Sequence, residues 1–319
     1  MRLLLLLFFA AMSTVSGQSL FIVEKPAFRA LVPDDAAIEK LADGFKFVEG
    51  PAWNVAGGFL VFSDIPGDKM YRYDPATKAA TVFRAPSQNA NGSFYDSVGN
   101  LYTCLHGARS VVQMDTSGLL RTIIDQFEGR KLNSPNDVTI KSDGTVWFTD
   151  PTYGLPKGQP KDQATNNVYR LDPKTGELRA VATDFTQPNG LCFSPDEKLL
   201  YVADSGHPPQ HIRVFDVTAD NTLANGRLFC EIDKGVPDGI RCDQHGNLFS
   251  SAGDGVHIFA PDGTRLGKIL VPETPANLCF GGAADDELFI TAKTSLYHIK
   301  LTTTGAGQAG PQDAPKGTH

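Results

Sequence analysis

Short runs of alternating apolar and polar residues fill most of the chain, and glycine, proline, asparagine and aspartate interrupt them at short intervals. Such alternation is typical of β-strands with one buried face, whereas a helix places apolar residues three and four positions apart. No stretch of the chain sustains that helical spacing. We therefore expect an all-β protein built from short antiparallel strands.

The strands recur in six similar units, with a period of roughly 40–50 residues that is typical of propeller blades. Three units begin with "SPNDVTIKSDGTVWFTD", "QPNGLCFSPDEKLLYVAD" and "VPDGIRCDQHGNLFSSAG". In each, an inner strand follows Pro-Asn or Pro-Asp, a turn reverses the chain, and a second strand runs back. This order predicts a six-bladed β-propeller. A two-sheet β-sandwich, the competing fold, would not explain six units with one internal order.

The expected propeller spans residues 41–301, and a ring of blades needs one strand to close it. The N-terminal segment, residues 18–40, and the residues just after it offer two candidates, "AFRALVP" and "AIEKLADGF". The C-terminal residues 302–319 are polar and rich in glycine and proline, so we expect them to be disordered.

Residues 1–17 combine a basic start, a short apolar core and small residues near Gly17. This is the pattern of a secretory signal peptide, with cleavage expected after Gly17. The apolar run is too short for a membrane span, and no later segment approaches the required length. We expect an exported protein, periplasmic or secreted, with no membrane partner.

The composition adds little to this picture but excludes one class of partner. The 319 residues are 41% hydrophobic and carry a net charge of -7, which is ordinary for a globular protein. The acidic balance and the absence of a Lys/Arg cluster argue against nucleic acid. The five cysteines lack metal-ligand spacing, so they are buried free thiols or, in an oxidising compartment, include a disulfide.

The first positions of the six inner strands carry the chemistry that most changes the interpretation. Read at that position, the six units give Glu49, Asn91, Asn136, Asn189, Asp238 and Asn277. Turn chemistry explains asparagine and aspartate there but does not predict the glutamate. Oxygen donors that converge on the channel make a site for a hard cation, and they favour Ca²⁺ over zinc or copper. Unliganded turn residues are the alternative.

The second strand of each unit ends at the same mouth where the first begins. This places around the pocket Asp64, His106, Asp150, Tyr153 and Asp204. His106 either moves protons or serves as a hydrogen-bonding wall, and a turn-stabilising role is favoured for the aspartates. Tyr153 lies in a loop long enough to cover the mouth. Motifs for a serine nucleophile, a zinc protease or a phosphate-binding loop are absent from the sequence.

Several phrases resemble the gluconolactonase–regucalcin family, which includes the senescence marker proteins. They are "FVEGPAW", "LVFSDIPGDKMYRYDP", "DGTVWFTDPTYG" and the Pro-Asn and Pro-Asp phrases quoted above. The likeness covers residues 41–300, and the second unit is similar to the bacterial gluconolactonase branch.

The resemblance implies a six-bladed propeller that holds a divalent cation, most often Ca²⁺, with Mg²⁺, Mn²⁺ or Zn²⁺ as alternatives. The implied ligands are Glu49, Asn136, Asn189 and Asp238. The implied reaction is hydrolysis of a small sugar lactone, in which the cation polarises the carbonyl and a carboxylate activates water. Asp238 is the implied base, and His106 or a cation-bound water competes for that role. Substrate contacts are expected from Asn91, Asn136, His106, Tyr153 and Asn277.

Two other functions fit the same sequence. The chain is a lactonase, esterase or phosphotriesterase for another substrate, or it is a non-enzymatic propeller whose cation is structural. Two carboxylates beside a titratable histidine favour an enzyme.

Overall fold

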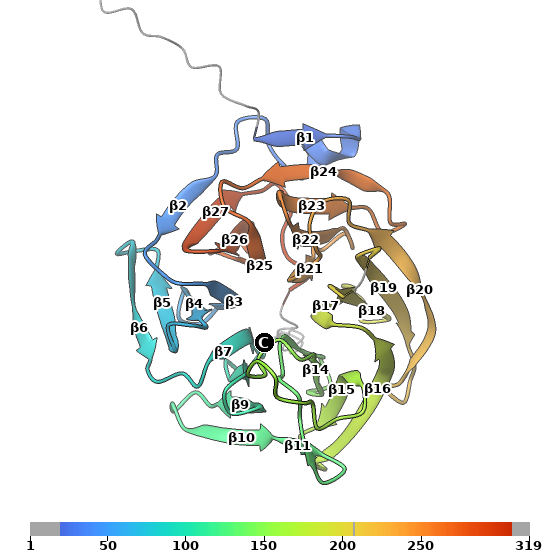
Figure 1. Cartoon of the computed structure of the whole chain (residues 1–319). Helices are drawn as coiled ribbons and strands as arrows, with labels where there is room; N and C mark the ends of the chain where they lie inside the picture. The colour runs from blue at the N-terminus through green and yellow to red at the C-terminus, as the bar shows by residue number, and fades with distance from the viewer. Residues whose placement is uncertain (1–19, 207, 308–319) are drawn as a thin grey trace, which may run out of the picture.

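The computed structural model describes residues 20–206 and 208–307. Six antiparallel sheets are arranged in a ring, so the predicted six-bladed β-propeller is confirmed (Figure 1). The signal-type segment, residues 1–17, lies outside the described residues. Within those ranges, no helix is long and apolar enough to cross a membrane.

Each blade begins with the strand nearest the centre and proceeds outward. The first blade consists of β3 (Val48–Asn54), β4 (Phe59–Asp64), β5 (Lys69–Asp74) and β6 (Ala79–Arg84). The second consists of β7 (Ala90–Tyr95), β8 (Leu101–Leu105), β9 (Ser110–Met114) and β10 (Leu120–Ile124). The third consists of β13 (Val138–Ile140), β14 (Val146–Asp150), β15 (Asn166–Asp172) and β16 (Glu177–Phe185). A small hairpin of β11 (Gln126–Phe127) and β12 (Arg130–Lys131) separates the second blade from the third.

The other three blades follow the same order. The fourth consists of β17 (Pro188–Phe193), β18 (Leu199–Asp204), β19 (His211–Val217) and β20 (Leu223–Glu231). The fifth consists of β21 (Ile240–Cys242), β22 (Leu248–Ala252), β23 (Gly255–Phe259) and β24 (Arg265–Leu270). The sixth has only β25 (Pro275–Gly281), β26 (Glu287–Ala292) and β27 (Ser295–Lys300) from this part of the sequence. The sixth blade therefore lacks an outer strand from its own stretch of sequence.

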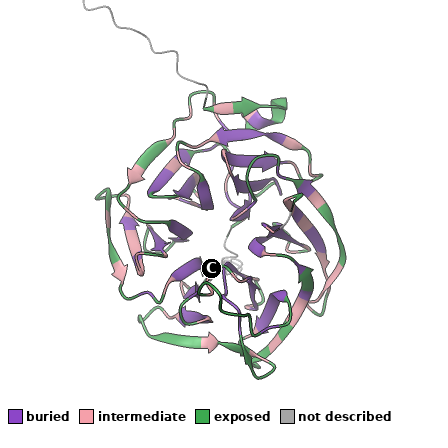
Figure 2. Ribbon diagram, viewed as in Figure 1, coloured by how far each residue is buried: buried purple, intermediate pink, exposed green. Residues whose placement is uncertain are grey.

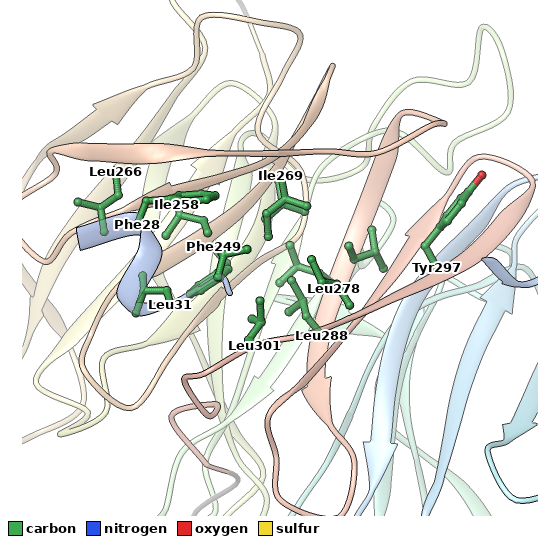
Figure 3. Packing of buried hydrophobic residues seen from close by; sticks show 14 of the residues in the cluster. Phe28, Leu31, Phe249, Ile258, Leu266, Ile269, Leu278, Leu288, Tyr297 and Leu301 are labelled. Carbon is green, nitrogen blue, oxygen red and sulfur yellow. The ribbon is translucent and has the colours of Figure 1, made fainter. Parts of the chain in front are cut away.

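The N-terminal segment completes the last two blades. β2 (Glu39–Ala42), from the second of the two candidate segments, pairs with β27 and closes the ring. The first candidate instead forms a 3-10 helix, η1 (Pro26–Ala30), whose Phe28 packs into the cluster between the fifth and sixth blades (Figure 3). β1 (Phe21–Val23) adds a fifth strand to the fifth blade, which the sequence did not predict.

Apolar side chains between neighbouring blades hold the ring together. Inner strands are almost wholly buried, while outer strands are exposed along one side (Figure 2). Aromatic rings bridge adjacent blades: Trp147 meets Phe193 edge to face at 5.4 Å, and Trp53 stacks on Phe289 at 5.2 Å. Such contacts fix each blade against its neighbours, which positions the inner strands that carry the site.

The cysteines and the C-terminal segment complete the comparison with the expectations. All five cysteines are buried free thiols, one of the two alternatives, and Cys192 Sγ lies 3.8 Å from Cys242 Sγ. The expectation of a disordered tail from residue 302 is wrong for residues 302–307. Thr303 is buried and donates to Asp243, and Gly305 N bonds Asp285 O, so these residues are held by the blades they cross.

Glu273 ties the closing strand to the sixth blade, and its loss is expected to destabilise the propeller. Its carboxylate accepts hydrogen bonds from Thr294, Ser295 and Tyr297 and lies 3.5 Å from Lys40 of β2. Charge-assisted bonds of this kind contribute about 1.5–3 kcal/mol each. We expect Glu273→Gln to lower the free energy of unfolding by about 2–3 kcal/mol in urea titrations at pH 7.

The effect of Glu273→Gln should depend on pH. Burial raises the pKa of Glu273, but hydrogen bonds from Ser295 and Thr294 outweigh it and lower the pKa to about 2. A lowered carboxyl pKa stabilises the fold above the usual value of about 4.5, and this contribution is lost as the pH falls toward 2. An equal difference between variant and wild type at pH 7 and pH 3 would contradict this assignment.

Candidate functional site

Backbone hydrogen bonds join neighbouring blades near the starts of their inner strands. Gly92 N donates to Asn136 O at 2.8 Å, and Gly190 N donates to Asp238 O at 3.1 Å. A Cβ atom on Gly190 would lie 2.2 Å from that oxygen, so only glycine permits this approach. Each glycine thereby fixes the residue before it beside the neighbouring inner strand. We call the residues in this position the ring: Glu49, Asn91, Asn136, Asn189, Asp238 and, in the sixth blade, Ala276.

The sequence predicted Asn277 as the sixth member of the ring, but the structure has Ala276 in that position. Gly239 N donates to Ala276 O at 2.8 Å, the same bond that ties the other inner strands together. Asn277 is one residue further on, and its Oδ1 accepts from the next N–H of its own strand, as Asp137 Oδ1 does. The Asn277 side chain also hydrogen-bonds Glu49. Its carboxamide is thus engaged within the protein.

Glu49 and Asp238 place two carboxylates in the ring. Glu49 is 3% exposed, and its Oε2 accepts from Gly50 N at 2.6 Å. Burial and the nearby charge of Asp137 raise the pKa of Glu49 to about 7. Burial and the charge of Glu49 likewise raise the pKa of Asp238 well above its usual value. The two acids therefore repel one another across the ring.

Asp137 and Arg241 add a buried ion pair that the sequence did not reveal. Arg241 Nη1 lies 3.4 Å from Asp137 Oδ2, and both residues are buried. Both also act electrostatically on Glu49. With Glu49 and Asp238 ionised, three carboxylates face one guanidinium, which leaves two uncompensated negative charges. A single divalent cation would balance them.

The ring residues fit a hard divalent cation. Their donors are carboxylate and carboxamide oxygens, the ligands that Ca²⁺ prefers. Among the described residues, Asp238 Oδ1 and Asn91 Oδ1 are buried without a hydrogen-bond partner. A cluster of three or more His, Cys, Asp or Glu side chains at metal-binding distance is absent from the described ranges. The proposed set contains only two such residues, and its other ligands are asparagines.

His106 lies just after β8 and supports Asn91. Asn91 Nδ2 lies 3.1 Å from His106 Nε2, and the histidine is 7% exposed. Burial lowers the pKa of His106 to about 4, so the imidazole of His106 is neutral at pH 7. A neutral histidine that accepts the Asn91 amide at Nε2 carries its proton on Nδ1. The nitrogen that would take a proton is therefore occupied, which favours the hydrogen-bonding wall, one of the two alternatives, over proton transfer.

Ser205 occupies the position in the fourth blade that His106 occupies in the second, and the sequence pattern did not single it out. Asn189 Nδ2 donates to Ser205 Oγ at 3.0 Å, and Ser205 Oγ donates in turn to Pro237 O. Tyr153 also hydrogen-bonds Ser205 through its side chain. Ser205 thus links Asn189, and the backbone of Pro237 just before Asp238, to the covering loop. Its place directly after the second strand was the available signal.

The loop of residues 151–165 contacts His106 and Ser205, the two residues that support the ring on this side. Gly154 N donates to Ser134 Oγ at 3.0 Å, and a Cβ on Gly154 would lie 2.4 Å from the His106 ring. Arg109 pairs with Asp162 near the other end of the loop. Tyr153 itself is 48% exposed. The loop is therefore anchored at both ends and leaves one face of Tyr153 available to a ligand.

The three predicted aspartates at the ends of second strands serve the backbone. Asp64 accepts from the N–H groups of residues 46, 47 and 67, and Asp204 accepts from those of residues 186, 187 and 206. Asp150 accepts from Asn133 N at 2.8 Å. Each ties the segment before an inner strand to the second strand of its blade. The turn-stabilising interpretation describes these contacts.

Known proteins share this architecture and sequence. Residues 47–294 match the family described as SMP-30/Gluconolactonase/LRE-like region. A gluconolactonase from Zymomonas mobilis is 32% identical over 93% of this chain and 90% of its own. A regucalcin from Oryctolagus cuniculus is 27% identical over 76% and 82% of the two chains. A solved gluconolactonase from Xanthomonas campestris, 35% identical, superimposes with a TM-score of 0.83 over 88% of this chain and 94% of that one.

Proposed function

This chain belongs to the SMP-30/gluconolactonase/LRE-like family, and we propose that it hydrolyses a sugar lactone at the ring with the help of a divalent cation. Lactone hydrolysis follows from the family and from the gluconolactonase relatives. The sugar, the cation and the roles of individual residues are the proposal. Its main support is the pair of repelling carboxylates, Glu49 and Asp238, in a ring of oxygen donors.

Glu49, Asn136, Asn189 and Asp238 would hold the cation, with Ca²⁺ the first candidate and Mg²⁺, Mn²⁺ or Zn²⁺ the alternatives. Bound there, a divalent cation supplies charge that polarises a lactone carbonyl and stabilises the oxyanion formed on attack by water. The supporting contacts come from the protein. Gly50 N orients Glu49, and Ser205 orients Asn189.

Asp238 is the proposed base that takes a proton from the attacking water. Its Oδ1 is buried and free of hydrogen bonds within the described part of the chain, while Asn189 binds the same carboxylate. One oxygen is thus oriented and the other is available to accept a proton. His106 is the competing base, and its Nε2 would first have to release Asn91.

The lactone hydroxyl groups would bind around the ring. Asn91 offers an unpartnered Oδ1 among the described residues, and Asn136, two residues before β13, adds a second carboxamide. Tyr153 adds a half-exposed ring and a hydroxyl held by Ser205. A polyhydroxylated ring needs several such partners in fixed positions, which supports a sugar lactone over an apolar ester.

Proton release from glucono-1,5-lactone tests this function. We expect chelation to reduce the enzymatic rate at least tenfold, and Ca²⁺ or another divalent ion to restore it, because the cation stabilises the oxyanion. Full activity after chelation would contradict the cation's role. Hydrolysis of an apolar ester or a phosphotriester, but no sugar lactone, would favour the other hydrolase functions. Cation binding without any hydrolysis would favour a binding propeller.

We also propose that the protein is exported. The support is the basic and apolar pattern of residues 1–17. N-terminal sequencing of the protein from its source is expected to begin at Gln18. An intact Met1 in the mature protein would contradict export by this signal.

A further inference from the structure

A cavity of about 690 Å³ lies at the other end of the channel from the ring. Side chains from the later parts of the inner strands line it, among them Trp53, Phe94, Thr139, Phe193, Arg241 and Phe280. The inner strands begin at the ring and run through the channel, so their later residues face the opposite mouth. Small-molecule sites typically measure about 300–1,000 Å³. The proposed lactonase site makes no use of this volume.

Arg241 gives the cavity its chemical character. The residue is 9% exposed and lines the cavity. Its Nη1 donates to Ile240 O at 2.7 Å and lies 3.4 Å from Asp137 Oδ2. Within the described residues, its Nη2 is buried without a hydrogen-bond partner. A buried guanidinium N–H without an acceptor is costly, and a carboxylate is the acceptor whose geometry matches it.

The other charged groups of the cavity limit the ligand to one negative charge. Asp196, Glu197 and Asp285 also line it. Glu197 accepts from Ser142 and lies 3.8 Å from Lys141, while Asp196 accepts from Ser194. Glu197 and Asp196 already have partners, and the three negative charges would repel a phosphate or a dicarboxylate more strongly than a monocarboxylate. The aromatic walls favour an apolar body.

We propose that this cavity binds a small organic monocarboxylate, with its carboxylate on Arg241 and its apolar part against Trp53, Phe193 and Phe280. The Arg241 fork would then complete its hydrogen bonds, and the aromatic side chains would cover the ligand. The cavity lies at the mouth opposite the ring, so a ligand could occupy it while a lactone is hydrolysed at the ring. Arg241 lies between the two sites, because it pairs with Asp137 and acts electrostatically on Glu49.

Isothermal titration of the full chain with 3-phenylpropionate tests the proposal, with 3-phenylpropanamide as the uncharged matched probe. We expect one site per chain for the acid and at least tenfold weaker binding of the amide. Arg241→Met should weaken binding of the acid at least tenfold. Equal binding of acid and amide, or unchanged binding by Arg241→Met, would overturn the proposal.

Two further variants keep the test decisive if Arg241→Met fails to fold. Ala284→Trp, at an exposed position in the cavity lining, should block binding and leave lactone hydrolysis unchanged. Asp238→Asn, in the ring, should bind the acid as the wild type does, with or without Ca²⁺. Loss of binding in Asp238→Asn, together with normal binding in Ala284→Trp, would place the acid at the ring and overturn the proposal.

Discussion

The Asp238→Asn variant is expected to hydrolyse glucono-1,5-lactone about 10³-fold more slowly than the wild type, because general-base catalysis contributes about 10²–10⁴-fold. The substitution keeps the shape of the side chain but removes its negative charge and its ability to take a proton. It also removes one of the two carboxylates that would balance a cation. We therefore expect weaker Ca²⁺ binding as well as slower hydrolysis, measured by calorimetric titration and by proton release.

Asp238→Asn should lose activity and Ca²⁺ affinity, but its free energy of unfolding should stay the same or rise. Without a cation, Asp238 and Glu49 repel one another. Asparagine relieves that repulsion, so the chelated variant should be at least as stable as the chelated wild type in urea. A functional group that lowers the stability of its own fold is the expected signature of a binding site. A large loss of stability would instead assign Asp238 a structural role.

Asp204→Asn is the matched control, since Asp204 lies close to the same mouth but binds backbone N–H groups. We expect it to lower the free energy of unfolding by about 1–3 kcal/mol and to retain Ca²⁺ binding. His106→Gln tests the competing base. If it lost as much activity as Asp238→Asn and bound Ca²⁺ normally, the base would be His106.

The repeats made the fold predictable, because each unit carries its own strand alternation and turn residues. "PND", "PNG" and "PDG" mark the starts of three inner strands, and a backbone hydrogen bond from Gly190 to Asp238 joins two of these starts directly. The glycine after two of them is the reason. It permits the close backbone contact that joins adjacent blades.

The same periodicity failed where one residue decides the register. In the sixth blade the ring position is Ala276, which has no polar side chain to mark it, so the sequence pattern indicates the neighbouring Asn277 instead. The shift lies in the irregular pairing between residues 275 and 277, and sequence alternation does not report such irregularities.

The repeats do not predict contacts between distant parts of the chain, for a different reason. Arg241 and Asp137 belong to different blades, 104 residues apart, and no local pattern links them. β1 joins the fifth blade by adding to its outer edge, where any short strand of suitable pattern can pair. Both features depend on how the ring brings the blades together, which the individual units do not encode.

Gly190→Ala is expected to reduce kcat/KM for the lactone by about 10²-fold, since a displacement of about 1 Å in a catalytic group has that effect. A Cβ on Gly190 would lie 2.2 Å from Asp238 O and 2.8 Å from the backbone of residues 239 and 240. These are backbone atoms of the neighbouring blade, so they can make room only if Asp238 moves. Overpacking of this kind costs about 1–3 kcal/mol.

Gly176→Ala separates this displacement from the general effect of replacing a glycine. Gly176 has a φ of +76° in an outer turn, and its Cβ would meet nothing within 4 Å. We expect Gly176→Ala to lower the free energy of unfolding by about 1–2 kcal/mol in urea titrations, because of backbone strain. Hydrolysis should be unchanged. Gly190→Ala should lose activity and Ca²⁺ affinity together, because the step that it disturbs is the placement of Asp238. Wild-type activity in Gly190→Ala would show that the contact between β17 and the start of β21 does not position the carboxylate.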